Sequence, residues 1–163
     1  MNEERRIEPE KIHILSIKTL KGKIENDEDA QSSSIIGYRY KNALAIALNV
    51  EERIVGLKHT IYIDTLNKKG EELNIKASYT HEFIFKVDNL NDFVNTTVKN
   101  ANDEEEQEEN IDPIMLGTLA GIAYSTVRGI VMNRTQGTAL NAVILPVIDP
   151  KKLTDLTVEE GKS

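Results

Sequence analysis

The chain has 163 residues, a formal net charge of −7 and no cysteine. A chain of this length suits one domain with a substantial buried core. The acidic balance argues against a general nucleic-acid-binding protein, which would show a basic face, and the lack of cysteine excludes disulfides, thiolate metal sites and cysteine nucleophiles.

The N-terminal stretch "MNEERRIEPEK" is charged, and no apolar run follows it. We therefore expect no secretory signal and a cytoplasmic location. Residues 1–10 are predicted to be a flexible N-terminus, 11–153 a single domain and 154–163 a flexible C-terminal tail.

The stretch "KIHILSIKTLKGKI" predicts a first strand with an irregularity. Ile12 and Ile14 share one parity of position, whereas Leu15 and Ile17 share the other, as happens where a strand contains a bulge. After the loop-like "ENDEDAQSSS", a second strand is indicated by the alternation of Leu44 with the apolar residues at 46, 48 and 50.

The strongest pattern is "LNIKASYTHEFIFKV", whose apolar and aromatic residues fall on odd positions and so have the period of a strand. The preceding "IVGLKHTIYIDTL" has the same parity, and "NKKGE" between them suits a turn. An antiparallel hairpin follows. Pairing Leu66 with Glu72 would place Ile61 opposite Ala77, with both apolar sets on one face.

Residues 88–112 are predicted to be a helical or acidic loop insertion. A weak helical pattern runs through Leu90, Phe93 and Val98 and ends in a run of acidic residues. That run lacks the alternating ligands and the glycine of a calcium loop, so a solvated loop is expected.

The stretch "PIMLGTLAGIAYSTVRGIVM" begins as a helix should, because Asp112 can cap it and Pro113 suits its first turn. Its length and the Gly117-x-x-x-Gly121 spacing are compatible with a membrane span, but the internal Arg128, several hydroxyl residues and acidic flanks argue against one. A helix apolar on more than one face must cover its own sheet and something else. We therefore expect an oligomer interface. Its predicted residues are Gly117, Ala120, Gly121, Tyr124 and Arg128.

Past "RTQGT", which would stop this helix, the proline-broken "LNAVILPVIDPKKL" is expected to end in a short helix starting at its Asp-Pro pair. The chain contains no nucleophile elbow, P-loop or dinucleotide fingerprint. The histidines His13, His59 and His81 have no carboxylate at a matching spacing, so no metal site, no cofactor and no enzymatic activity are expected.

The order of these elements resembles that of the SecB family of protein-export chaperones. The likeness is sharpest where Gly137 and Thr138 are followed by Pro146 and Val147. The resemblance implies an α+β fold with a four-stranded antiparallel sheet, a long interface helix and a short C-terminal helix. It also implies a cytoplasmic homotetramer, built as a dimer of dimers.

The resemblance further implies an ATP-independent molecular chaperone that binds unfolded or non-native polypeptide in hydrophobic grooves. It would serve protein export or a dedicated client such as an antitoxin. The alternative is an adaptor module for one specific folded partner. The residues carried over as groove-lining, each of which could equally be ordinary core, are Tyr38, Tyr40, Leu44, Ile46, Val143, Leu145 and Val147.

In that family the translocase ATPase SecA docks onto acidic residues of the sheet's outer surface. The aligned positions here are Thr19, Lys23, Lys76 and Ser78, which are neutral or basic. Like charge would remove the attraction for a basic tail. SecA docking is therefore not expected, and neither nucleic acid nor a membrane is expected as a partner.

Overall fold

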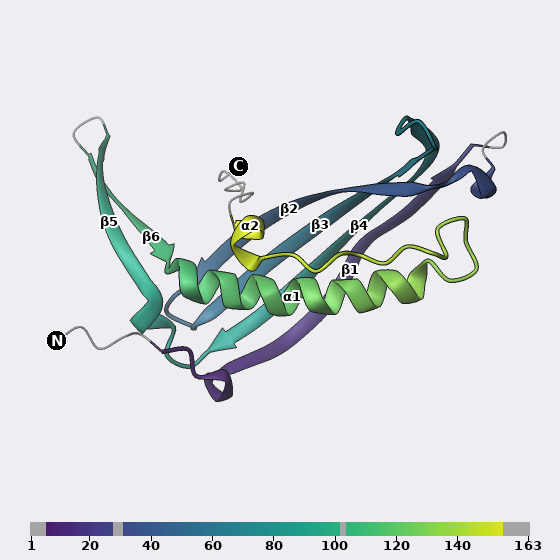
Figure 1. The fold of residues 1–163 in the computed structure, drawn as a ribbon. Coiled ribbons are helices and arrows are strands. Elements are labelled where there is room, and N and C mark those ends of the chain that lie inside the picture. Colours follow the sequence, from purple (N-terminus) through teal and green to yellow (C-terminus); the bar gives the residue numbers. More distant parts are fainter. Residues whose placement is uncertain (1–5, 28–30, 102–103, 155–163) are drawn as a thin grey trace.

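A computed structural model describes residues 6–27, 31–101 and 104–154 and shows a four-stranded antiparallel sheet with a long helix across one face (Figure 1). The sheet has the strand order β1-β4-β3-β2. Its strands are β1 (Ile12–Asn26), β2 (Gly37–Asn49), β3 (Ile54–Leu66) and β4 (Glu72–Val87). The helices are α1 (Pro113–Arg134) and α2 (Pro150–Thr154). This is the α+β architecture expected from the sequence.

The core lies between α1 and the facing side of the sheet. Odd-numbered side chains of β3 and β4 form its floor, among them the fully buried Leu57, Ile61 and Phe83. From α1, Leu119 and Val127 pack down onto them and are equally buried. The period-two pattern of the sequence therefore identified the buried face correctly.

The predicted hairpin register is wrong by two residues, although its face is right. Leu66 does pair with Glu72, but a bulge follows, and Ile61 lies opposite Tyr79 instead of Ala77. The hydroxyl of Thr65 donates to the carbonyl oxygen of Ile75 across 2.8 Å inside this irregularity. Because the shift is an even number of residues, every side chain keeps its face.

The irregularity expected in the first strand is confirmed and is double. The pairing of β1 with β4 shifts between Ile14 and Ser16 and again between Thr19 and Lys21. Leu15 and Leu20 are the extra residues at these two bulges. Each bulge changes the parity of the strand, so Ile12, Ile14, Ile17 and Ile24 all lie opposite odd-numbered residues of β4, on the helix side of the sheet.

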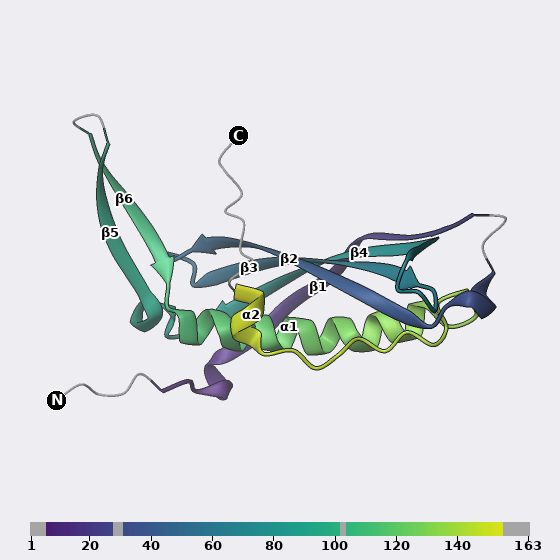
Figure 2. The same ribbon diagram turned by 45° about the horizontal axis from the view of Figure 1, so that its top comes forward.

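Residues 94–111 form a β-hairpin, which corrects the prediction of a helix or loop. A single 3₁₀ turn at Leu90–Phe93 is followed by β5 (Val94–Ala101), which pairs with β6 (Glu104–Ile111). β-Branched residues in β5 favour a strand and outweigh the weak helical spacing. Figures 1 and 2 show this hairpin projecting away from the end of the main sheet.

Helix α1 starts as predicted, because the Asp112 carboxylate accepts a hydrogen bond of 2.8 Å from the backbone N–H of Ile114. Within the described residues it is the one helix whose length and composition would allow a membrane span, and here it packs along the sheet. After it, residues 136–149 run back beside α1 to α2, which lies at the predicted Asp-Pro pair (Figure 2).

The expected N-terminal and C-terminal tails lie partly outside the described residues, which exclude 1–5 and 155–163. Within the described part of the N-terminal stretch, Pro9–Lys11 form a 3₁₀ turn and Ile7 packs against the core.

Candidate functional site

The return segment, residues 136–149, is held along α1 and β2 by side-chain donors. The Tyr40 hydroxyl on β2 donates to the carbonyl oxygen of Ile144 (3.3 Å). On α1, the Tyr124 hydroxyl donates to the carbonyl oxygen of Pro146 (2.9 Å). Arg128 Nε donates to the carbonyl oxygen of Leu145 (3.0 Å). Burial raises the pKa of both tyrosines, which keeps the phenols protonated and able to donate.

A hollow of about 220 Å³ opens between α1 and this return segment. It is lined by Ser125, Arg128, Gly129, Met132, Ile144 and Leu145. Ile144 is 69% exposed and Met132 is half-exposed on the helix side, while Val147, further along the return segment, is 83% exposed. Exposed aliphatic side chains gathered beside a hollow are typical of a surface that binds another apolar group.

The structure divides the predicted groove-lining residues into two groups. Leu44, Val143 and Leu145 are at most 2% exposed and belong to the chain's own core. Tyr38 and Tyr40 are half-buried and stacked on each other with ring centroids 6.3 Å apart. Together with half-buried Ile46 and exposed Val147, these tyrosines are the predicted residues that a bound segment could touch directly.

The predicted interface residues of α1 lie in different surroundings. Ala120 and Tyr124 are buried within the chain. Gly121 faces α2, because a Cβ atom there would lie 3.2 Å from Pro150 Cγ. A Cβ atom on Gly117 would meet nothing within 4 Å. Arg128 is half-buried at the hollow. The outward side of α1 at Gly117 is thus open in a single chain, and an interface there stays a prediction.

Sequence reasoning missed a second apolar surface, on β1. Its residues Ile14, Leu15, Ile17 and Leu20 are between 42% and 56% exposed, and β1 is an edge strand of the sheet. The signal was present in the broken parity of Leu15 and Ile17, which indicated a bulge. Parity alone does not tell whether the rest of the chain covers these apolar side chains.

Two of the three histidines lie in the core. His59 and His81 are directly opposite each other on β3 and β4, and both are at most 1% exposed. Burial, with His81 beside it, lowers the pKa of His59 to about 4. Burial, with Arg134 nearby, also lowers that of His81. Both are therefore neutral at pH 7. His13 is exposed and contacts Asp88 at 3.0 Å.

Within the described residues, no three His, Cys, Asp or Glu side chains gather in a way that would hold a metal ion. His59 Nε2 lies 2.9 Å from Asn42 Oδ1, so its proton is on that nitrogen. The imidazole ring of His59 stands edge-on to that of Tyr124, with centroids 5.8 Å apart. These contacts give the histidine pair a packing role beneath α1.

The positions aligned with the family's SecA-docking surface divide by face. Lys23, Lys76 and Ser78 lie on the side of the sheet away from α1, as their cross-strand partners show. Thr19 is opposite His81 and accepts a 3.4 Å hydrogen bond from Arg134, so it lies on the helix side.

Comparison with known proteins supports the fold. No protein-family model and no curated sequence matches the chain. Among solved structures, it is similar to the Mycobacterium tuberculosis Rv1957 SecB-like chaperone, which was solved in complex with a ChAD peptide from the Rv1956 HigA1 antitoxin. The TM-score is 0.60 at 13% sequence identity, over 86% of this chain and 92% of the other. The chain therefore has a SecB-like fold.

Proposed function

We propose that this chain is an ATP-independent molecular chaperone that binds unfolded or non-native polypeptide segments between α1 and the return segment. The observation that carries the proposal is the exposure of Met132 and Ile144, which line the hollow, together with exposed Val147 further along the return segment. The SecB-like fold adds to it, since the similar solved structure is a chaperone with a bound peptide.

The chemistry of the site suits a non-native chain. An unfolded segment offers apolar side chains and unpaired backbone groups. The site offers aliphatic side chains that can adapt to different sequences, with the aromatic pair Tyr38 and Tyr40 at the adjoining strand. The described residues of the site include neither a nucleotide-binding loop nor a nucleophile–base pair. Binding and release of a segment would therefore depend on whether the client itself has folded.

The test replaces apolar side chains that contribute nothing to the core. Val147→Asp and Ile144→Asp place a charge at two of the most exposed apolar positions, where the cost to folding is within about 0.5 kcal/mol. Light scattering of several chemically unfolded proteins would be followed with each variant. We expect the wild-type chain to suppress aggregation and both variants to lose most of that effect.

Val98→Asp is the matched control, since Val98 is also exposed but lies on β5, on the projecting hairpin. It makes the same chemical change away from the hollow and should suppress aggregation like the wild type. If Val98→Asp is impaired as much as Val147→Asp, the effect comes from net charge and the proposed site is wrong.

The alternative function is an adaptor for one specific partner. The antitoxin peptide in the similar structure favours a dedicated client. Suppression of one antitoxin's aggregation, but of no unrelated unfolded protein, would favour this narrower role. Suppression of unfolded export precursors as well would favour a general export chaperone.

We also propose that the chain assembles as a homotetramer. Open space above Gly117 and the exposed apolar residues of β1 support this. Gly117→Leu adds a side chain that meets nothing within its own chain, so it should leave the protomer's stability intact while weakening assembly in sedimentation. A wild-type chain that sediments as a monomer, or a variant that stays tetrameric, would overturn this interface.

A further inference from the structure

The face of the sheet turned away from α1, here called the outer face, has a regular arrangement of side chains. Even-numbered residues of β3 lie on it, because the odd-numbered His59 contacts Tyr124 of the helix. The strand register then places residues of all four strands side by side. One such row, from β2 to β1, is Lys41, Tyr62, Ser78 and Lys23, and the next is Ala43, Thr60, Thr80 and Lys21.

Basic side chains outnumber carboxylates on the outer face, although the whole chain carries a net charge of −7. By the register, the basic residues are Lys18, Lys21, Lys23, Arg39, Lys41, Lys58, Lys76 and Lys86, and the carboxylates are Glu25, Asp64, Glu72 and Glu82. Positive charge is thus concentrated on one face of an acidic protein.

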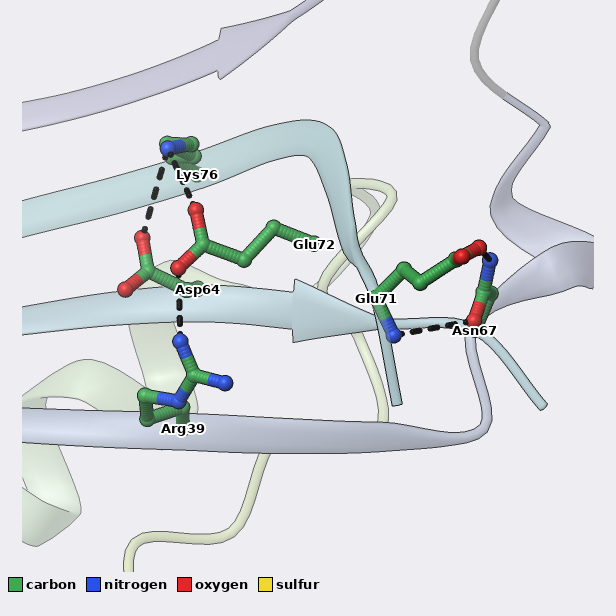
Figure 3. A network of polar contacts seen from close by, with 6 residues as sticks. All are labelled: Arg39, Asp64, Asn67, Glu71, Glu72 and Lys76. Atoms are coloured by element: carbon green, nitrogen blue, oxygen red, sulfur yellow. Dashed lines mark hydrogen bonds and ion pairs between the residues drawn. The ribbon is translucent and has the colours of Figure 1, made fainter. Parts of the chain in front are cut away.

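Two of the outer-face carboxylates, Asp64 and Glu72, are paired with basic residues at one end of the sheet (Figure 3). Arg39 Nη1 donates to Glu72 at 2.6 Å, and Lys76 Nζ lies 3.1 Å from Glu72 and 3.8 Å from Asp64. Glu25 pairs with Lys23. Among the described residues, Lys21 and Lys41 have no carboxylate in ion-pair contact, and both are exposed.

Between these two lysines lie three hydroxyl-bearing side chains, of which Thr80 is buried and Tyr62 is exposed. The hydroxyl oxygens of Thr60 and Thr80 are 3.0 Å apart, and Tyr62 is 46% exposed beside them. Lys41 is on β2 and Lys21 is on β1, three strand spacings away, which corresponds to about 14 Å. An extended peptide laid across these side chains could contact both lysines with carboxylates and the hydroxyls with its polar groups.

We propose that the outer face binds an acidic polypeptide segment, with Lys21 and Lys41 contacting its carboxylates and Tyr62 packing between them. Charge complementarity selects the occupant, because exposed cations without an ion-pair partner attract anions and repel basic chains. A long nucleic acid fits less well than a short acidic segment, because it would extend beyond the basic face onto the rest of an acidic chain with a net charge of −7. Single-strand binding also relies on several stacking aromatics, and the outer-face rows contain one aromatic residue, Tyr62.

The experiment measures binding of a fluorescently labelled peptide of alternating Glu and Ser by anisotropy. Low ionic strength is used first, followed by about 0.15 M salt, where screening shortens the Debye length to about 8 Å. The double variant Lys21→Glu/Lys41→Glu should bind roughly tenfold more weakly than the wild type. Tyr62→Ala should weaken binding with no change of charge. Circular dichroism checks that each variant is folded.

The matched control is Lys151→Glu/Lys152→Glu, which makes the same change of charge at exposed positions of α2, on the helix side. It should lose less than about twofold in affinity. Equal losses in the two double variants would show attraction to net charge alone and overturn the proposal. Binding of a single-stranded oligonucleotide as tight as that of the peptide would also overturn it. Neither outcome bears on aggregation suppression at the hollow on the helix side.

Discussion

Acidification should destabilise this protein through His59. The ring is 1% exposed, and its pKa in the folded protein is about 4, against about 6.5 in an unfolded chain. The folded state binds the proton of His59 less tightly than the unfolded chain does. The contribution of this residue to stability is therefore fully present above pH 6.5 and is lost as the pH falls toward 4. Between pH 7.5 and 4.5 this linkage removes about 2.5 kcal/mol from the free energy of unfolding. His81, whose pKa is also lowered, acts in the same direction.

The assay is urea unfolding followed by far-UV circular dichroism, since the chain has no tryptophan. His59→Gln keeps a side-chain donor for Asn42 and removes the titrating ring, so its stability should fall less between pH 7.5 and 4.5 than that of the wild type. His13→Gln, at an exposed histidine, is the control and should follow the wild type. Equal pH dependence in the wild type and His59→Gln would refute the reasoning.

Three further changes test local features of the fold by urea unfolding. Asp112→Ala should lower stability by about 1 kcal/mol, because the N-terminal cap of α1 at Ile114 is lost; no loss would mean that water replaces the cap fully. Gly121→Leu places its Cβ atom 3.2 Å from Pro150 Cγ and should lower stability by about 1–3 kcal/mol. The substitution should also detach α2, which would appear as faster proteolysis of the C-terminal segment. Unchanged proteolysis would contradict this contact. Tyr40→Phe removes one donor to the return segment and should cost about 0.5–1.5 kcal/mol, and a neutral result would show that this bond is not formed in solution.

The predictable parts of the fold were those set by local rules. The buried face of β3 and β4 follows from period two alone, and the start of α1 follows from Asp112 and Pro113. The exact pairing of the hairpin did not follow, because it depends on the extra residues of β4 opposite Thr65, whose hydroxyl bonds to the Ile75 carbonyl. The sequence offers no pattern for that contact.

Tertiary context also decided the points that sequence reasoning missed. The acidic composition of residues 104–109 suggested a solvated loop, yet backbone pairing with β5 makes them a strand. Alternation placed Leu44 on the apolar face of β2 but could not show what covers it. It lies in the core, while Val147 on the return segment is exposed. Which apolar residues remain available for binding depends on how the return segment is held, and a one-dimensional pattern does not contain that information.

One helix cannot cover one side of a four-stranded sheet completely, and this geometry leaves apolar surface on β1. The four half-exposed side chains of β1 would release about 3–6 kcal/mol if they were fully buried. Burial of this surface would offset part of the cost of association with a second chain, which is about 4–15 kcal/mol in lost translational and rotational freedom. The opposite face of the sheet offers little such surface and is predominantly basic. The two proposed sites therefore differ in chemistry, with exposed apolar side chains on the helix side and mostly basic side chains on the outer face.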